Sequence, residues 1–422
     1  MNINDIKKEL LVGLGRWECL YTDPDAECPR IIEALDTFYS VFGRDDVMVL
    51  SVPGRSEIIG NHTDHNSGKV MAGAITRDIV AVAARNDSDY IRFRSEGYPA
   101  DQIPLSAITD PDAFKRFTSR ALVAGVAGGF VKAGYKVSGF DIYMTTKVQK
   151  GSGLSSSAAF EVMVGNALNH LFNGGEIDNK EIAKIARYSE NVYFGKPCGL
   201  MDQMACAVGG FVYIDFADSA SPGVTPVSFS LSDAGYALCI TNTGGSHANL
   251  NDDYASVPEE MKAVARAIGR EVLLGATEEE LIASVDKIRK AASDRALLRA
   301  IHFVRECERV ERAKAALTRG DTEAFLKQIK ESGESSFCYL QNVFTCKAPG
   351  EQGMSLALAL SDGYLRDKGG AWRVHGGGFA GTVQAFVPKS SLEGYKALLN
   401  SVFGEGAVDV LSIRPYGAIR LY

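Results

Sequence analysis

Apolar positions in the first half of the chain follow a strand period in some stretches and a helical period in others. Runs rich in β-branched and aromatic residues predict strands at residues 47–52, 78–84, 90–95 and 140–146. A stripe of Ile182, Ile185 and Val192 follows an acidic capping pair and predicts a helix over about residues 178–195. We therefore expect layers that combine helices and strands.

The second half begins with strand-like runs and then becomes strongly helical. The pattern predicts strands at residues 210–216, 236–242 and 382–388, and helices at about 261–268 and 293–320. A domain usually holds roughly 100–200 residues, so a chain of 422 residues is expected to form more than one. The change in the pattern of strand-like and helical segments predicts an N-terminal domain, residues 1–205, and a C-terminal domain, residues 206–422, that share a cleft.

The composition excludes several classes of protein. With 46% hydrophobic and 23% charged residues, the chain is not disordered, collagen-like or a coiled coil. Its net charge of −7 argues against general binding to nucleic acid or to membrane surfaces, so any anion site must be local. Eight scattered cysteines without a CxxC pair are typical of reduced thiols. A charged N-terminal stretch and the lack of a long apolar run predict a cytoplasmic protein.

A polar segment, residues 53–66, follows the first predicted strand, where loops often carry ligand groups. Arg55 offers a rigid cation, Asp64 an acceptor for sugar-like hydroxyls and His62 a polar ring. The segment could instead be a polar turn with satisfied hydrogen bonds. A metal site of His62, Asp64 and His65 is a weaker alternative, because no predicted helix fixes the two histidines and no further ligand is evident.

Two further segments are rich in glycine. Residues 150–159 lead from glycines and serines into a predicted helix, and free N–H groups at a helix start suit a polyphosphate, although a plain helix cap would also explain them. The spacing is not that of the common phosphate-binding loop, since neither Lys69 nor Lys196 follows the required glycine pattern. Residues 372–382 hold three consecutive glycines, which a tight hairpin or a close ligand would each explain.

Taken together, the three segments resemble the motifs of the small-molecule kinase superfamily named for galactokinase, homoserine kinase, mevalonate kinase and phosphomevalonate kinase. Residues 54–68, GRSEIIGNHTDHNSG, are most similar to its galactokinase signature, G-R-x-N-L-I-G-E-H-T-D-Y-N-x-G. The resemblance continues in residues 197–203, PCGLMDQ, and in residues 371–381. It implies an α+β fold of two domains, with mixed and antiparallel sheets packed by helices and the active site in the cleft between the domains.

The resemblance implies that Asp202 and Arg55 are the catalytic residues. In galactokinases the Asp of the M-D-Q motif faces the C1 hydroxyl of the sugar, and the Arg of the first motif lies beside it. Phosphoryl transfer needs positioning, charge stabilisation and a group that accepts the hydroxyl proton. A carboxylate beside a guanidinium stays ionised at neutral pH, so Asp202 could act as the base or mainly orient the hydroxyl. A buried salt bridge without chemistry is the plain alternative.

The resemblance also implies that ATP and Mg²⁺ take part. The residues expected at the phosphates are Gly151, Ser152, Gly153, Leu154, Ser155, Ser156, Ser157 and Ala158. Mg²⁺ is expected on Ser156 or Ser157 together with Glu190, because hard oxygen ligands suit this ion. Glu190 could equally be a solvated residue of the predicted helix.

The residues implied to bind the sugar are Asn61, His62, Asp64, Gly199 and Tyr254. The chain departs from the signature at Asn61, where the family has a Glu that accepts a hydrogen bond from the C6 hydroxyl of the sugar. An amide has one acceptor, two donors and no charge, so Asn61 could still bond a hydroxyl, though in a different sense. The departure bears on the selectivity at C6 and leaves Arg55, Asp202 and the serine triplet unchanged.

The expected function is ATP-dependent phosphorylation of galactose at the C1 hydroxyl, by a monomer whose partners are a small-molecule sugar and ATP. One alternative is the same chemistry on a related sugar, such as galactosamine or a C6-modified galactose. Another is a sensor that binds sugar and nucleotide without phosphoryl transfer. The intact serine triplet and the presence of Arg55 and Asp202 disfavour the sensor.

Overall fold

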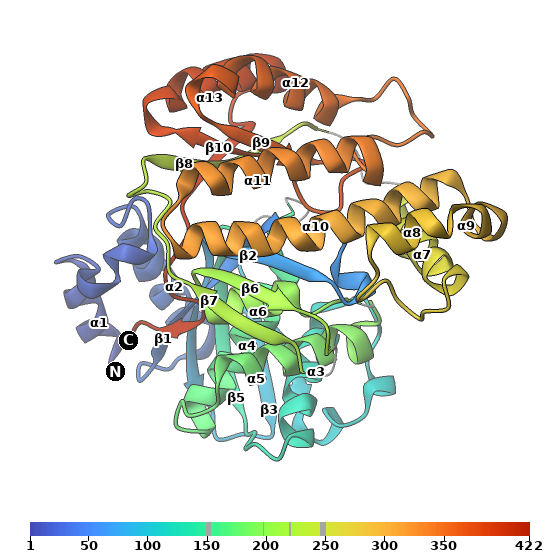
Figure 1. Ribbon diagram of the computed structural model, residues 1–422. Coiled ribbons are helices and arrows are strands. Elements are labelled where there is room, and N and C mark those ends of the chain that lie inside the picture. The colour runs from blue at the N-terminus through green and yellow to red at the C-terminus, as the bar shows by residue number, and fades with distance from the viewer. Residues whose placement is uncertain (149–152, 197, 219–220, 245–249) are drawn as a thin grey trace. The chain divides into compact units, whose positions relative to one another are not determined.

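The computed structural model describes residues 1–148, 153–196, 198–218, 221–244 and 250–422 (Figure 1). These residues fold into two compact units. Unit 1 comprises Met1–Arg55, Ala74–Gly210 and Arg414–Tyr422, and unit 2 comprises Ser56–Gly73 and Phe211–Ile413. Each unit has hydrophobic clusters of its own.

This division differs in two segments from the one predicted at residues 205 and 206. The break at Gly210 and Phe211 lies close to the predicted boundary, but Ser56–Gly73 belongs to unit 2 and Arg414–Tyr422 belongs to unit 1. The reason is that strands β1 (Met48–Ile59) and β2 (Lys69–Arg85) are longer than predicted, and each runs from one unit into the other. A change from strand-like to helical segments along the sequence does not reveal that a strand runs from one unit into the other.

Unit 1 contains a mixed sheet with the strand order β12–β1–β2–β5–β3–β4. Its other strands are β3 (Tyr90–Ser95), β4 (Asp101–Pro104), β5 (Phe140–Thr146) and β12 (Ile419–Arg420). β3 and β5 are parallel, whereas β5 is antiparallel to β2, and β12 is antiparallel to β1. The predictions for β3 and β5 are confirmed, and the mixed sheet agrees with the expected fold class.

Unit 1 also contains helices. They are α1 (Ile3–Leu10), α2 (Glu27–Phe42), α3 (Ser119–Lys132), α4 (Ser156–Phe172), α5 (Asn179–Tyr188) and α6 (Met201–Val208). α2 packs against β5, and α3 packs against β4. α4 packs against α3, α5 and α6, and Figure 1 shows α4 and α5 side by side. α5 continues into a π-helical turn, Ser189–Phe194, which ends at Gly195, in agreement with the helix predicted over residues 178–195. Wide helical turns of this kind occur often at functional sites.

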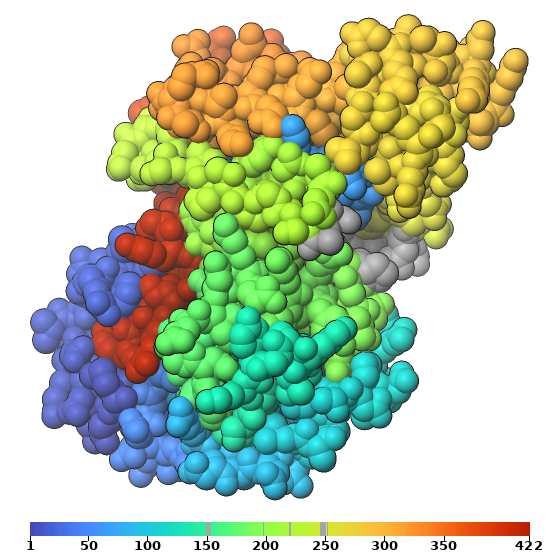
Figure 2. Space-filling view, turned by 60° about the horizontal axis from the view of Figure 1, so that its bottom comes forward, coloured from blue at the N-terminus to red at the C-terminus, as the bar shows by residue number. Residues whose placement is uncertain are grey.

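The two ends of the chain meet on the surface of unit 1. The indole Nε1 of Trp17 donates a hydrogen bond of 3.0 Å to the carbonyl of Leu421, and Leu421 belongs to the same hydrophobic cluster as Ile3 and Ile6. Figure 2 shows the dark blue N-terminal segment next to the red C-terminal segment. The N-terminal residues therefore complete the core of unit 1 and fix β12 at the edge of its sheet.

Unit 2 contains an antiparallel sheet with the order β11–β8–β10–β9. Its strands are β8 (Tyr236–Asn242), β9 (Ala371–Val374), β10 (Thr382–Pro388) and β11 (Val408–Leu411). The strand predicted at residues 382–388 is thus confirmed. β6 (Phe211–Asp215) and β7 (Gly223–Val227) pair with each other, and β6 also pairs with the first residues of β2.

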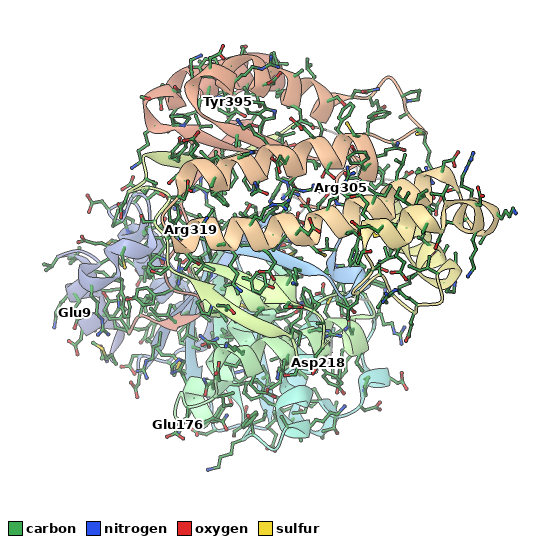
Figure 3. All side chains as sticks on the ribbon, viewed as in Figure 1. Glu9, Glu176, Asp218, Arg305, Arg319 and Tyr395 are labelled. Atoms are coloured by element: carbon green, nitrogen blue, oxygen red, sulfur yellow. The ribbon has the colours of Figure 1, made fainter. Side chains whose placement is uncertain are left out.

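The helices of unit 2 cover this sheet and extend beyond it. They are α7 (Asn251–Ala267), α8 (Glu278–Ala283), α9 (Val285–Ala291), α10 (Asp294–Thr318), α11 (Thr322–Ser335), α12 (Gly353–Leu365) and α13 (Leu392–Phe403). Figure 1 shows the sheet between α11 on one face and α12 and α13 on the other. α10 and α11 form an antiparallel pair, and Figure 3 shows side chains filling the space between them. Within the described part of the chain, no helix combines the length and the apolar character needed to cross a membrane.

Candidate active site

Arg55 and Asp202 meet inside unit 1. Arg55 lies on β1, Asp202 lies in the first turn of α6, and Arg55 Nε and Nη2 are each 2.9 Å from Asp202 Oδ1. The Arg55 side chain also donates to the carbonyl of Gly153, and its backbone N–H donates to Leu154. A Cβ atom at Gly54 would lie 2.6 Å from the Leu154 carbonyl oxygen, so only glycine permits this close approach. The strand, the glycine loop and the carboxylate therefore form one hydrogen-bonded cluster.

Ser155 completes this cluster. Its backbone is left-handed, with φ 60° and ψ 54°, and its hydroxyl does not cap α4. The hydroxyl instead donates a hydrogen bond of 2.6 Å to Asp202 Oδ2. Both oxygens of the carboxylate are thus held by the protein, one by Arg55 and the other by Ser155. The sequence pointed to Ser155 only as a phosphate-binding residue and did not predict this contact.

The carboxyl group of Asp202 is ionised at neutral pH. Burial alone would raise its pKa, but the charge and hydrogen bonds of Arg55, the Ser155 hydroxyl and the charge of Lys196 together hold the pKa below its ordinary value. The Asp202 side chain is still 32% exposed, so the ionised group is accessible. An accessible carboxylate with a low pKa can accept a hydrogen bond from a hydroxyl and receive its proton as the oxygen becomes more acidic.

Glu190 lies on the π-helical turn that follows α5 and is only 2% exposed, which excludes the alternative of a solvated helix residue. Its Oε1 accepts hydrogen bonds from Ser157 Oγ at 3.3 Å and from Lys196 Nζ at 3.0 Å. Its Oε2 accepts from Gln203 Nε2 at 2.8 Å. The sequence assigned no role to Gln203, which directly follows Asp202 in the motif that carried the resemblance, and it considered Lys196 only to reject it as the lysine of a common phosphate-binding loop.

The donor set at Glu190 fits the magnesium ion that the resemblance implies. A carboxylate and the hydroxyl of Ser157 are hard oxygen ligands within one hydrogen-bond distance of each other, and Mg²⁺ takes its remaining ligands from phosphates and water. The other metal site considered above, with His62, Asp64 and His65, does not form. No group of three His, Cys, Asp or Glu side chains among the described residues is arranged to hold a metal ion.

The phosphate-binding residues expected from the sequence are described only in part. Gly151 and Ser152 lie outside the described residues. Gly153 and Leu154 lie in the loop that contacts Arg55, Ser155 precedes α4, and Ser156, Ser157 and Ala158 form its first turn. Gly199, expected to contact the sugar, lies in unit 1 shortly before α6. The N–H groups of the first turn of a helix are available to an anion, so this end of α4 suits a phosphate.

In unit 2, three of the residues expected to bind the sugar contact three consecutive glycine carbonyls, those of residues 376–378. Asn61 Nδ2 donates to the first carbonyl at 2.7 Å, His62 Nε2 lies 2.9 Å from the second, and Tyr254 Oη donates to the third at 2.9 Å. The first and third glycines of this segment have positive φ, of 68° and 81°, which turns the backbone so that its carbonyls can face these side chains. The glycine segment thus supports the signature loop, residues 60–68 between β1 and β2.

Asn61 itself is completely buried and does not have the role that the sequence suggested. Besides the carbonyl of residue 376, its amide nitrogen contacts Glu57 Oε1 at 3.1 Å, and its oxygen accepts from Asn342 Nδ2 at 2.7 Å. Both donors and the acceptor of the amide are therefore used within unit 2. The expectation that Asn61 bonds a sugar hydroxyl is corrected by this geometry, because no hydrogen-bonding capacity faces outward.

His62 and Asp64 keep groups that suit a polar ligand. His62 has a positive φ of 60°, and burial, aided by the nearby His65, lowers the pKa of its imidazole to about 4. The ring is therefore neutral at pH 7, with the proton on Nε2 beside the glycine carbonyl and an acceptor at Nδ1. Asp64 is largely buried and accepts a hydrogen bond of 3.0 Å from the N–H of His65. Strained backbone at a non-glycine residue such as His62 is common at binding sites.

The signature loop rests on α10, which the sequence did not link to the site. Glu306 Oε1 accepts from the N–H groups of Gly60 at 3.0 Å and Asn61 at 3.4 Å, and from Ser332 Oγ at 2.6 Å. Its Oε2 accepts from Arg309 Nε at 2.7 Å. Burial alone would raise the pKa of Glu306, but neighbouring positive charges, above all Arg309, lower it to about 2. The loop backbone is thus held by a buried carboxylate that stays charged.

His302 lies one helical turn before Glu306 and holds the same loop. Its Nε2 lies 3.0 Å from the carbonyl of Asn61, and its Nδ1 lies 2.9 Å from Ser335 Oγ. Burial lowers the pKa of His302 to about 4, so the ring is neutral at pH 7. No local pattern marked His302 and Glu306, but their spacing of four residues on a predicted helix was a usable signal that they share a face.

The predicted site residues thus divide between the units. Unit 1 holds Arg55, Asp202, the described part of the glycine and serine segment, Glu190 and Gly199, whereas unit 2 holds Asn61, His62, Asp64 and Tyr254. Within each unit the structure brings together residues that are far apart in the sequence. Arg55 and Asp202 are separated by 147 positions, and Asn61 and Asn342 by 281.

Comparison with known proteins places the chain among relatives of known family. Residues 36–85 match the galactokinase galactose-binding signature, and residues 121–210 match the GHMP kinases N terminal domain. A galactokinase of Streptomyces coelicolor is 31% identical over 372 residues, which cover 87% of this chain and 92% of the relative. A galactokinase of Thermotoga neapolitana is 30% identical over 356 residues, with coverage of 84% and 94%.

Solved structures show the same fold. A crystal structure of Lactococcus lactis galactokinase complexed with galactose matches with a TM-score of 0.77 at 24% identity, covering 92% of this chain and 99% of that one. The mevalonate kinase of Methanococcus jannaschii matches with a TM-score of 0.61 at 16% identity, covering 88% and 99%. On the sequence relatives and the matching fold, the chain belongs to the galactokinase family of the GHMP kinases, which are sugar and other small-molecule kinases.

Proposed function

We propose that this sugar kinase transfers the γ-phosphoryl group of ATP to the C1 hydroxyl of galactose. The observation that carries the proposal is the cluster of Arg55, Asp202 and Ser155 at the start of α4. A carboxylate that stays ionised, a fixed guanidinium and a helix N-terminus are the groups that phosphoryl transfer to a hydroxyl needs. Galactokinase relatives that cover most of the chain support galactose as the sugar.

In this mechanism each side chain has a distinct role. Asp202 accepts the hydrogen bond of the sugar hydroxyl and takes its proton as the oxygen attacks phosphorus. Arg55 fixes the carboxylate and offsets negative charge that develops on the transferred group. The N–H groups at the start of α4 face the phosphates. Ser157 and Glu190 would hold Mg²⁺, which when bound neutralises charge on the phosphate oxygens.

A substrate panel tests this function. Purified protein with ATP and Mg²⁺ is expected to release ADP when galactose is added, measured in a coupled assay. The phosphate should be found on C1 of the product by ³¹P and ¹³C NMR. Sugar binding without ADP release would identify a sensor instead. If none of the tested sugars causes ADP release, the assignment of the substrate is wrong.

A second candidate is a kinase for a related sugar, and the burial of Asn61 favours it. A signature loop without the carboxylate usual at this position has lost a charged acceptor for the C6 hydroxyl, which favours a C6-modified galactose. Galactosamine, which differs from galactose at C2, is the other related sugar to test. Comparing kcat/KM for galactose, 6-deoxygalactose and galactosamine decides between the two. A site that reads the C6 hydroxyl with a buried polar group would discriminate strongly against the 6-deoxy sugar, whereas this chain is expected to discriminate weakly.

The magnesium role of Glu190 gives a separate prediction. In Glu190→Gln the Mg²⁺ concentration for half-maximal velocity is expected to rise by at least about 10-fold, because an anionic ligand is replaced by a neutral one. Glu176→Gln is the matched control, since Glu176 is an exposed residue of the same unit, labelled in Figure 3. If kcat falls in Glu190→Gln at every Mg²⁺ concentration but the half-maximal concentration is unchanged, Glu190 is not a ligand of the ion.

A further inference from the structure

Ser155 combines two features that rarely occur together without a function. A non-glycine residue with φ 60° is strained, and the strain persists only where the surroundings enforce it. A serine that precedes a helix normally uses its hydroxyl to cap the helix, whereas this hydroxyl does not. The left-handed backbone carries the hydroxyl to Asp202 Oδ2, at 2.6 Å.

The contact also gives the two oxygens of the Asp202 carboxylate different partners. Arg55 holds Oδ1 with two nitrogens, each at 2.9 Å, whereas Ser155 is the residue in the described part of the chain that donates to Oδ2. A carboxylate oxygen has two lone pairs, so one hydrogen bond from Ser155 leaves the second lone pair of Oδ2 for a substrate hydroxyl. A carboxylate held at both oxygens cannot rotate about its Cβ–Cγ bond without breaking two charge-assisted hydrogen bonds.

We propose that Ser155 is a positioning residue for the kinase reaction, which holds Asp202 Oδ2 toward the sugar hydroxyl rather than binding ATP through its side chain. The inference rests on the proposed function, because it takes Asp202 to be the group that receives the proton. It gives two serines of the segment different roles, since Ser155 acts on the carboxylate whereas the hydroxyl of Ser157 lies at Glu190.

Two variants separate the hydroxyl from the backbone strain. Ser155→Gly removes the hydroxyl and relieves the positive φ, whereas Ser155→Ala removes the hydroxyl and keeps the strain. Both are expected to lower kcat by about 10- to 100-fold, the range for loss of one hydrogen bond to a charged group, with the KM for ATP nearly unchanged. Ser293→Ala is the control, because Ser293 caps α10 in unit 2 through Ala296 and has no contact with Asp202.

The pH profile gives the readout that a merely structural role would not move. The Ser155 hydroxyl helps to hold the pKa of Asp202 down, so its removal raises that pKa. The activity depends on the ionised carboxylate and is lost as the pH falls through this pKa. The acid limb of kcat/KM is therefore expected to move to higher pH in both Ser155 variants and to stay in place in Ser293→Ala.

The remaining outcomes overturn the proposal. Wild-type kcat and an unmoved acid limb in both Ser155 variants would show that the hydroxyl does not act on Asp202. Loss of activity in Ser155→Ala but not in Ser155→Gly would assign the effect to the backbone. A rise in the KM for ATP alone would place the hydroxyl at the nucleotide. Full activity of Asp202→Asn, measured in parallel, would refute the proposed function itself, so the two failures are distinguishable.

Discussion

Asp202→Asn is expected to lower kcat for galactose by roughly 10²- to 10⁴-fold, the range for loss of a general base. The amide has the same shape as the carboxylate but cannot take the proton of the attacking hydroxyl. It also cannot pair with the charge of Arg55, which now lies 2.9 Å from Oδ1. The loss should appear in the coupled ADP assay and equally in single-turnover measurements, where product release has no influence.

Binding measurements distinguish this loss from a general disruption. ATP affinity, measured by calorimetry, is expected to stay within a few-fold of the wild type, because the N–H groups at the start of α4 do not depend on the Asp202 charge. Asp233→Asn, at an exposed turn of unit 2, should leave every parameter unchanged. If Asp202→Asn turns over at the wild-type rate, Asp202 does not receive the proton, and another base must be found.

Glu306→Gln is expected to lower the free energy of unfolding by about 3–5 kcal/mol, measured by urea denaturation. Glu306 is fully buried, and its replacement leaves Arg309 charged, buried and without its ion-pair partner. The amide nitrogen of Gln would also face other donors, either the N–H groups of Gly60 and Asn61 with the Ser332 hydroxyl, or Arg309 Nε, all of which now point at a carboxylate oxygen. The sugar KM should rise along with the loss of stability, because the signature loop loses its support.

Two other variants calibrate this result. Glu308→Gln, two positions further along α10, breaks an exposed pair with Arg312 at 3.5 Å and should change stability by at most about 0.5 kcal/mol. Ser332→Ala removes one of the donors to Glu306 and should cost about 1 kcal/mol while the fold stays intact. If Glu306→Gln is no less stable than Glu308→Gln, the buried cluster does not hold the loop.

The sequence was most informative where chemistry and local pattern coincide. Arg55 and Asp202 were paired correctly through motifs 147 positions apart, and the strand at residues 382–388 and the helix at 293–320 follow from period alone. Glu190 was singled out through the family resemblance as a magnesium ligand, which stays a prediction, and neither its wide helical turn nor its contact with Lys196 was foreseen. These residues could be predicted because each belongs to a motif or to a regular repeat.

The contacts that were missed depend on tertiary structure. Whether Asn61 faces a ligand or the interior is decided by Asn342 and the glycine carbonyls, which lie hundreds of residues away. The same holds for His302 and Glu306, whose helix was predicted but whose partners at Gly60 and Asn61 were not. For a related reason the sequence did not predict that Ser56–Gly73 belongs to unit 2 and Arg414–Tyr422 to unit 1. Strand pairing between distant residues, such as Leu50 with Arg420, produces no pattern in the local sequence.

The packing of Asn61 constrains which residues position 61 can accept. Introducing the signature glutamate by a single substitution would bring a second carboxylate against Glu57 Oε1 and against the carbonyl oxygen of residue 376, both of which now receive N–H donors. Three acceptors would then meet, and the two hydrogen bonds that the amide nitrogen of Asn61 donates would be lost. A glutamate at position 61 is therefore expected only together with a second change, at Glu57 or at a residue that contacts it.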